Sequence, residues 1–160
     1  MMANDGGMIA VIEQWLADTL AALTSGGEAV FKTAEVWRHQ ISGTKGGLEA
    51  FDRYAPFAFP SYQDCDGARE GDNDLRQILA FAILIGVEAK ADSDARTGNA
   101  QQLGTSRIRD LVIAALDHQR PDGEFAYAID EFFYISDVEV IDTTKQHALQ
   151  IIVECSFMTM

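Results

Sequence analysis

Hydrophobic and polar positions along this chain recur with two periods, which predicts a mixture of helices and strands. Near the N-terminus, in residues 8–24, apolar side chains return every three or four positions, as in an amphipathic helix that ends at Gly26-Gly27. Near the C-terminus, in residues 146–157, they return every second position, as in a half-buried strand of an antiparallel hairpin. The helical set is Ile9, Ile12, Leu16, Leu20 and Leu23, and the strand set is His147, Leu149, Ile151, Val153, Cys155 and Phe157.

The same patterns predict further elements between these two. They are strands at residues 28–38, 55–62 and 132–141, a turn of helix within residues 47–54, and a helix at residues 101–117. Pro56 and Pro60 cannot donate to a strand ladder, so their strand is expected at a sheet edge or at a bend. Loops are expected at residues 42–47 and 89–99, and an exposed turn at residues 64–74, where Asp, Asn and Gly dominate. A short turn at residues 142–145 is expected to join the last two strands.

Residues 75–88 form the most apolar segment and predict a long strand. Its odd positions are bulky and its even positions are small but still apolar, so both faces should be covered. Either helices of the same subunit cover both faces, or a neighbouring subunit covers one of them. The second possibility is the basis of our functional expectation.

Clustered strands with two flanking helices favour the α+β class, with one mostly antiparallel sheet of four to five strands flanked by two main helices. A chain of 160 residues has the size of one domain. We expect that domain to span residues 8–157, after a flexible segment at residues 1–7.

Acidic residues outnumber basic ones by 25 to 12, and they are unevenly distributed. Residues 121–144 contain seven acids and no Lys or Arg, and residues 64–74 contain five acids and one Arg. Binding to phosphate backbones needs clustered Lys and Arg, so this composition argues against a nucleic-acid-binding protein. The acids are expected to form either an ordinary solvated surface or an acidic surface or lumen that repels DNA. The candidate residues are Asp64, Asp66, Glu70, Asp72, Asp74, Asp130, Glu131, Asp137 and Glu139.

Motifs for catalysis or nucleotide binding are absent from the sequence. The acids from Asp64 onward miss the spacing of a calcium loop, although adventitious calcium binding stays open. No histidine has a recognised metal-ligand spacing, and His147, on the apolar face of the last strand, is expected to be a hydrogen-bonded core residue. A nucleophilic set around Cys65 also stays open. We therefore expect a protein without catalytic residues, cofactor or metal. The two cysteines, Cys65 and Cys155, are expected to be reduced, although pairing is open.

Several segments together resemble the Mu-type phage tail protein family, which is similar to the tail terminator proteins of long-tailed bacteriophages. These segments include the long apolar strand with the polar loop after it, and a terminal pair of strands. The matching residues are Met8-Ile9-Ala10, Phe57-Ala58-Phe59-Pro60, Gly104-Thr105, Ile108-Arg109-Asp110-Leu111, Leu116-Asp117 and Phe157. The resemblance extends over residues 8–157.

This resemblance implies a tail terminator: a homo-hexameric ring that caps the tail tube and joins it to the neck. The implied partners are copies of the chain, the tail tube protein and a neck or head-completion protein, with DNA passing through unbound. The implied location is the virion tail, after assembly in the host cytoplasm and without a membrane. In such a ring Arg69, Arg107 and Arg109 are candidate subunit contacts, unless they are ordinary solvated charges. The alternatives are a neck or head-completion protein of similar fold, or a small α+β enzyme or ligand-binding protein.

Overall fold

The computed structural model describes residues 7–41, 51–70, 74–90, 93–122 and 129–159; side chains at 68–70, 74–75 and 158–159 lie outside that description. Two longer helices and seven strands lie in these residues, together with a helical turn at residues 51–54. The helices are α1 (Gly7–Ala21) and α3 (Thr105–Leu116). The strands are β1 (Thr24–Ser25), β2 (Glu28–Ala29), β3 (Thr33–Ala34), β4 (Phe57–Glu70), β5 (Asp74–Glu88), β6 (Phe133–Asp142) and β7 (Gln146–Thr159).

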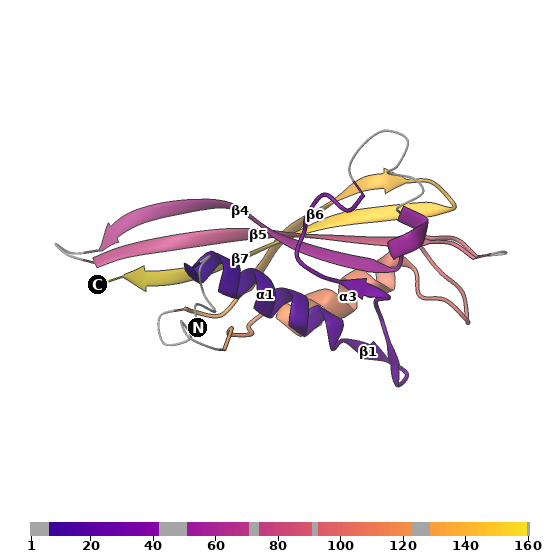
Figure 1. The fold of residues 1–160 in the computed structure, drawn as a ribbon, viewed down its shortest axis with the longest axis horizontal. Coiled ribbons are helices and arrows are strands. Elements are labelled where there is room, and N and C mark those ends of the chain that lie inside the picture. The colour runs from indigo at the N-terminus through magenta and orange to yellow at the C-terminus, as the bar shows by residue number, and fades with distance from the viewer. Residues whose placement is uncertain (1–6, 42–50, 71–73, 91–92, 123–128, 160) are drawn as a thin grey trace.

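Five strands form one mixed sheet in the order β3-β4-β5-β7-β6, and β1 and β2 form a separate hairpin. The pairing of β3 with β4 is parallel, and the other three pairings of the large sheet are antiparallel. Both long helices lie on the same side of this sheet (Figure 1). The α+β class predicted from the sequence is therefore confirmed, with one parallel pair in the sheet.

The main core lies between the helices and one face of the sheet. The odd positions of β5 supply its centre, and five of them, Leu79, Phe81, Ile83, Ile85 and Val87, are at most 1% exposed. Buried residues of α1 and α3 pack against them at helical spacing: Ile12, Leu16 and Leu20 from α1, and Ile108, Val112 and Leu116 from α3. The apolar stripe predicted for the first helix is confirmed for Ile12, Leu16 and Leu20, and α3 has a similar stripe, since both stripes face the sheet.

On the opposite face of the sheet, which we call the outer face, part of the chain itself covers β5. Phe51, Phe57 and Phe59 form a buried aromatic cluster there, with Trp37 packed against it. A Cβ atom on Gly86 would overlap the Phe57 ring, so only glycine fits beneath this cluster. The expectation that an external copy shields this face is wrong at the Gly86 end. The other end is more open, with Ile78 39% exposed.

The strand predicted for residues 28–38 is wrong. Only Glu28–Ala29 and Thr33–Ala34 are extended strands there, because the chain crosses the edge of the sheet between its two faces. Val30 and Phe31 belong to the helix-side core, whereas Trp37 belongs to the outer cluster. Gly26 and Gly27, both with positive φ, form the two-residue turn of the β1–β2 hairpin, although we expected them to end the first helix.

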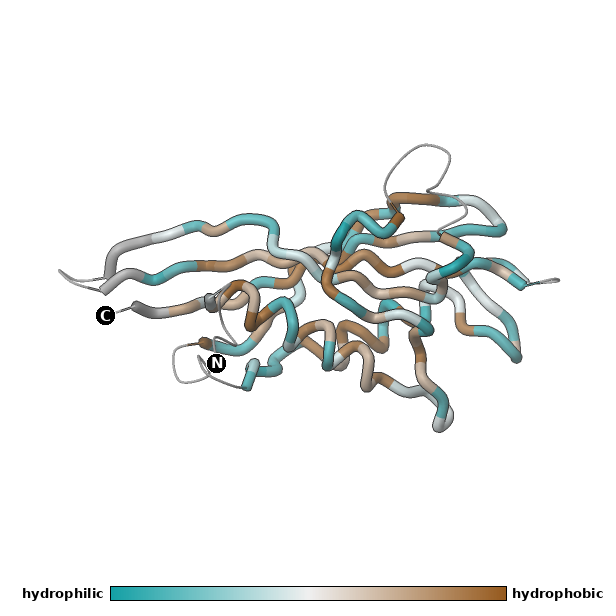
Figure 2. Tube along the Cα trace, viewed as in Figure 1, coloured by the Kyte–Doolittle hydropathy of each residue, from teal (hydrophilic) through white to brown (hydrophobic). Residues whose placement is uncertain are grey.

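The exposed turn predicted for residues 64–74 is also wrong for residues 64–70 and 74, whereas residues 71–73 lie outside the described part of the chain. β4 continues to Glu70 and β5 begins at Asp74, so the two strands pair almost to their ends. Asp64 and Asp66 consequently lie on an extended strand opposite Ala80 and Ile78, which is not the backbone of a calcium loop. Beyond α1 the sheet projects at this end, and Figure 2 shows hydrophilic residues along β4 there. Composition predicted a turn because it does not show that these residues pair with β5, the strand that follows directly in the chain.

Helix α3 begins four residues later than the sequence predicts, because the preceding loop folds tightly against itself. Gly104 is its N-cap, and Leu103 forms a β-bridge with Gly98. In this loop the Asn99 carboxamide oxygen accepts hydrogen bonds from the backbone amides of Gln101 and Gln102, and the Gln102 side-chain amide donates to the carbonyl of Glu88. A Cβ on Gly104 would overlap the carbonyl group of Arg96 and part of Thr97, so the backbone passes there at contact distance.

The two cysteines lie in one row of the sheet and flank Leu79, which separates them by two strand spacings, roughly 9–10 Å. A disulfide requires Cα atoms within about 7 Å, so both remain free thiols. Burial, with a contribution from Asp130, raises the pKa of the Cys155 thiol to about 12, whereas Cys65 is exposed.

We expect iodoacetamide at pH 8 to modify Cys65 in the folded protein and to leave Cys155 unmodified, since the thiolate is the reactive form. Mass spectrometry of the tryptic peptides measures this, with protein in urea as the control in which both react. Equal labelling of the two thiols in the folded protein would contradict the burial of Cys155.

Candidate functional site

Strand β6 is an edge of the sheet and carries an unusual number of exposed apolar side chains. Four large hydrophobic residues on it are 44–56% exposed: Phe133, Ile135, Val138 and Val140. Two irregularities in its pairing with β7, at Ile135 and at Val140, twist the strand between them. Edge strands are usually protected by charge or short length, because their free amides and carbonyls can pair with another chain. β6 has two bulges and carries acidic side chains, which are such protection, but its four exposed apolar side chains still form an apolar surface at this edge.

A shallow hollow on the outer face adjoins this edge. It encloses about 250 Å³ between Trp37, Phe59, Leu84 and Val140, with Gln150 among its polar neighbours. The apolar surface of β6 is thus continuous with the partly covered outer face described above. The hollow has few converging polar groups, so it favours contact with another apolar surface over binding of a polar ligand.

Those predicted acidic residues whose side chains the structure describes divide into two sets, which lie on opposite faces of the sheet. Asp64 and Asp66 are exposed on the outer face, in the rows of Ala80 and Ile78. Asp130 extends the second of these rows, since its carboxylate accepts a hydrogen bond from Ser156, the β7 partner of Ile78. The structure thus places these three acids on one face of the projecting end.

In the second set, Asp137 is paired within the chain. Its carboxylate accepts hydrogen bonds from Arg109 of α3, at 2.7 Å, and from the hydroxyl of Tyr134. Partial burial by itself would raise the pKa of Asp137, but the hydrogen bonds from Tyr134 and Arg109 and the Arg109 charge outweigh it, so that pKa is lowered. The hydrogen bond to Asp137 likewise raises the pKa of Arg109. This group ties α3 to the edge strand, and a subunit contact through Arg109 stays a prediction.

Glu131 is also paired, with His118 at the end of α3. The Nδ1 atom of His118 lies 3.1 Å from the Glu131 carboxylate, and its Nε2 atom lies 3.5 Å from that of Asp117. The hydrogen bond to Glu131, aided by the charge of Asp117, raises the pKa of His118. The two carboxylates contact opposite nitrogens of the ring, so they do not converge on one point.

Glu139 and His147 belong to a further polar group at the end of the β6–β7 hairpin. His147 is 1% exposed, as predicted for a core histidine, and its Nδ1 atom makes a hydrogen bond with the buried hydroxyl of Thr105. Its Nε2 atom lies 3.2 Å from Glu139 and 3.8 Å from Asp142. We call these four residues the His147 cluster. It lies where the β6–β7 turn meets the first residue of α3.

The surroundings of the His147 cluster come from the loop before α3. Arg96 lies 3.5 Å from Glu139, and a hollow of about 290 Å³ opens between Asp94, Arg96 and Asp142. Backbone amides of Arg96 and Thr97 donate to Asp94 and lower its pKa. The loop is anchored to the β6–β7 turn by the hydrogen bond from the Ala95 amide to the Thr144 carbonyl, at 2.8 Å.

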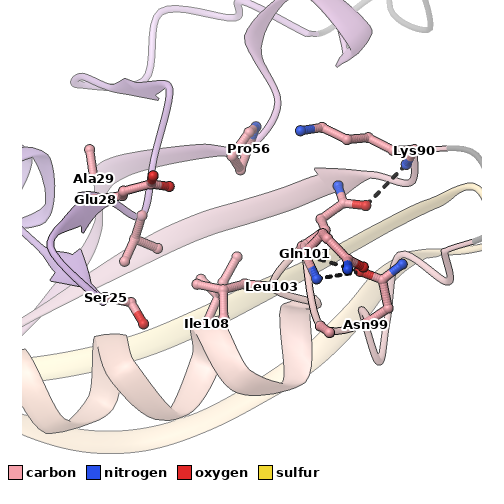
Figure 3. A pocket seen from close by; sticks show the side chains of 12 residues that line it. Ser25, Glu28, Ala29, Pro56, Lys90, Asn99, Gln101, Leu103 and Ile108 are labelled. Carbon is pink, nitrogen blue, oxygen red and sulfur yellow. Dashed lines mark hydrogen bonds between the residues drawn. The ribbon is translucent and has the colours of Figure 1, made fainter.

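Another hollow, of about 360 Å³, lies between the β1–β2 hairpin, Pro56 and the loop before α3. Figure 3 shows Glu28 and Lys90 on its opposite sides, and dashed lines mark the hydrogen bonds that hold the loop. Of the loop polar residues that line it, Asn99 and Gln102 are already engaged by the backbone, and Gln101 is exposed. We therefore assign no chemistry to this hollow.

Some predicted site residues lie outside the described part of the chain. Asp72 lies there entirely, as do the side chains of Arg69, Glu70 and Asp74. Arg107 is exposed on α3 and makes no ion pair with any described residue. Their predicted roles stay predictions.

Sequence reasoning missed Asp142, Thr105 and Arg96 as members of a site. The spacing of residues along the sequence did not indicate this site. Asp142 lies five residues before His147, which is not a recognised metal-ligand spacing, and Thr105 lies on a different element, α3. The hairpin predicted over residues 132–157 brings Asp142 near His147, but it places Asp142 in the turn at residues 142–145; the register that pairs the two residues directly comes from the structure.

The fold and these surfaces define an α+β protein with exposed apolar side chains on an edge strand and a buried histidine beside two carboxylates. Comparison with protein-family models and with curated protein sequences finds no match. In the part of the chain that the structure describes, no helix combines the length and the apolar composition needed to cross a membrane.

Proposed function

We propose that this protein is a structural assembly protein of the phage-tail type, a tail terminator whose copies close into a ring on the tail tube. The observation that carries the proposal is the edge strand β6 with its four exposed apolar side chains. An edge of this kind pairs with another strand, and the simplest occupant in a self-assembling protein is a second copy of the chain. The likeness to tail terminators described from the sequence suggests the type of assembly.

The acidic character of the chain supports the same proposal. Asp64, Asp66 and Asp130 share the outer face of the projecting end, and the chain carries a net charge of −13. A ring with such a surface toward its opening would let DNA pass without binding. Like charges on adjacent subunits repel, so association is expected to strengthen as salt screens them.

The test is the mass of the assembly for the wild type and for a variant with Val138→Lys and Val140→Lys. We expect the wild type to form rings, and the variant to be monomeric, because lysine on an edge strand opposes pairing. Native mass spectrometry and light scattering measure the mass, and electron micrographs show whether rings are present. Both substituted side chains are more than half exposed, so the variant should keep the wild-type melting temperature.

Ile78→Lys is the matched control, because Ile78 is also an exposed apolar strand residue but lies away from β6. We expect this control to assemble like the wild type. A wild-type protein that remains monomeric at high micromolar concentration, without rings in micrographs, would refute the proposal. Adding purified tail tube protein or neck protein to the ring then distinguishes the two functions. A tail terminator is expected to bind the end of the tail tube, and a neck protein is expected to bind other neck proteins.

A further inference from the structure

Three potential metal ligands converge at the His147 cluster from the paired strands β6 and β7, close to the turn between them. Asp142 is the register partner of His147, and Glu139 lies opposite Leu149, on the same face of the sheet. One ligand atom from each of Glu139, Asp142 and His147 lies within 4.8 Å of the other two. Around a tetrahedral Zn²⁺, with bonds of about 2.1 Å, ligand atoms are about 3.4 Å apart. The observed separations from Nε2, 3.2 and 3.8 Å, bracket that value.

The histidine of this group is held as metal-binding histidines usually are. Its Nδ1 atom is hydrogen-bonded to the Thr105 hydroxyl, which fixes the plane of the ring and directs Nε2 toward the carboxylates. Metal-bound imidazoles typically use their second nitrogen in such an outer hydrogen bond. Apart from Glu139 and Asp142, Nε2 of His147 contacts no polar group of the described residues, although the side chain is 1% exposed. A buried ring nitrogen is thus directed into the site and meets only anionic ligands.

Charge and space at the site both suit a hydrated cation. The side chains of Glu139 and Asp142 are 40% and 55% exposed, so water can reach the ion from one side. The hollow beside Asp142 has room for further water ligands. Arg96 is the only described base in contact with Glu139; its side chain is 55% exposed and can turn into solvent when a cation replaces it.

We propose that Glu139, Asp142 and His147 bind a divalent transition-metal ion, Zn²⁺ in the first instance, through one imidazole nitrogen and two carboxylate oxygens with water completing the shell. An imidazole ligand favours Zn²⁺ over Mg²⁺ and Ca²⁺, which prefer oxygen ligands alone. The bound ion would join β6 to β7, and through Thr105 to α3, and so would hold the edge strand in place. This inference does not depend on the ring proposed above.

The experiment is isothermal titration calorimetry of untagged protein with ZnCl₂, with Cys65→Ser in every sample to remove the exposed thiol. We expect one saturable site per chain, and at least about tenfold weaker binding in Asp142→Asn and in Glu139→Gln, because each loses a charged ligand. Both substituted side chains are exposed, so these variants are expected to fold. Circular dichroism confirms folding, and a rise in melting temperature with Zn²⁺ gives a second readout.

His118→Asn is the matched control, since His118 also lies beside two carboxylates, but on opposite ring nitrogens. We expect Zn²⁺ binding by this variant to equal that of the wild type. Absence of saturable binding by the wild type, or wild-type affinity in both carboxylate variants, would overturn the proposal. Binding of MgCl₂ or CaCl₂ as tight as that of ZnCl₂ would also overturn it, because the imidazole would then not be a ligand. A monomeric protein that binds Zn²⁺ would refute only the ring.

Discussion

Phe81→Ala is expected to lower the free energy of unfolding by about 3–5 kcal/mol, the usual cost of removing a fully buried aromatic ring. Phe81 is 0% exposed at the centre of β5, and its ring contacts those of Tyr62 and Phe132 edge to face. The helices cannot close the resulting cavity, because each is also held by the other positions of its stripe. For a chain of this size the melting temperature should fall by roughly 6–20 °C. Urea unfolding monitored by circular dichroism measures the change.

Phe133→Ala is the matched control for this substitution. Phe133 is 44% exposed on β6, so the same change removes a ring that is already half in water. We expect a loss of at most about 1 kcal/mol, measured at a protein concentration low enough to exclude association. Similar losses for the two variants would mean that Phe81 is not at the centre of the core.

Gly104→Ala is expected to destabilise the protein by about 1–3 kcal/mol through steric overlap. The backbone at Gly104 has φ −87° and ψ 166°, which alanine adopts readily, so the conformation itself carries no penalty. Because alanine reduces the conformational entropy of the unfolded chain, the substitution would by itself stabilise the folded protein by about 0.4–1 kcal/mol. The overlap outweighs this gain, because the atoms in contact with the new Cβ are backbone atoms of Arg96 and Thr97. Urea unfolding measures the net effect.

The same substitution should also disturb the His147 cluster. Thr105 follows Gly104 directly, and a shift at the start of α3 moves its hydroxyl away from His147. Nuclear magnetic resonance of the His147 ring protons reports that change. Ser106→Ala is the control, since its side chain is exposed and already has a Cβ, and it should leave stability and the His147 signals unchanged. Unchanged stability in Gly104→Ala would show that the backbone is not in close contact there.

The elements with a strong period were predictable from local sequence alone. The alternation of residues 146–157 is confirmed in β7, where the predicted inner positions from His147 to Cys155 are at most 6% exposed. The stripe of the first helix is confirmed for Ile12, Leu16 and Leu20. Both patterns are strong because each residue in these elements either packs against the core or faces water. The period of the apolar positions indicates which residues pack against the core.

Local sequence failed where pairing partners decide the conformation. Residues 64–70 have the composition of a turn but extend as a strand, because β5 supplies a continuous partner from Leu75 to Gly86. Residues 30–37 alternate like a strand, yet they cross the sheet edge because their apolar side chains are divided between two cores. A local pattern does not state which face each side chain will meet.

The sequence by itself determined the α+β class, the two long helices, the terminal hairpin and the strongly acidic character of the chain. Only the tertiary structure decided the strand order, the cover of the outer face at Gly86, the exposure of β6 and the convergence of Glu139, Asp142 and His147. The physical reason is that periodicity records whether a residue meets water or the interior. Which residues meet each other depends on contacts between segments far apart in the chain.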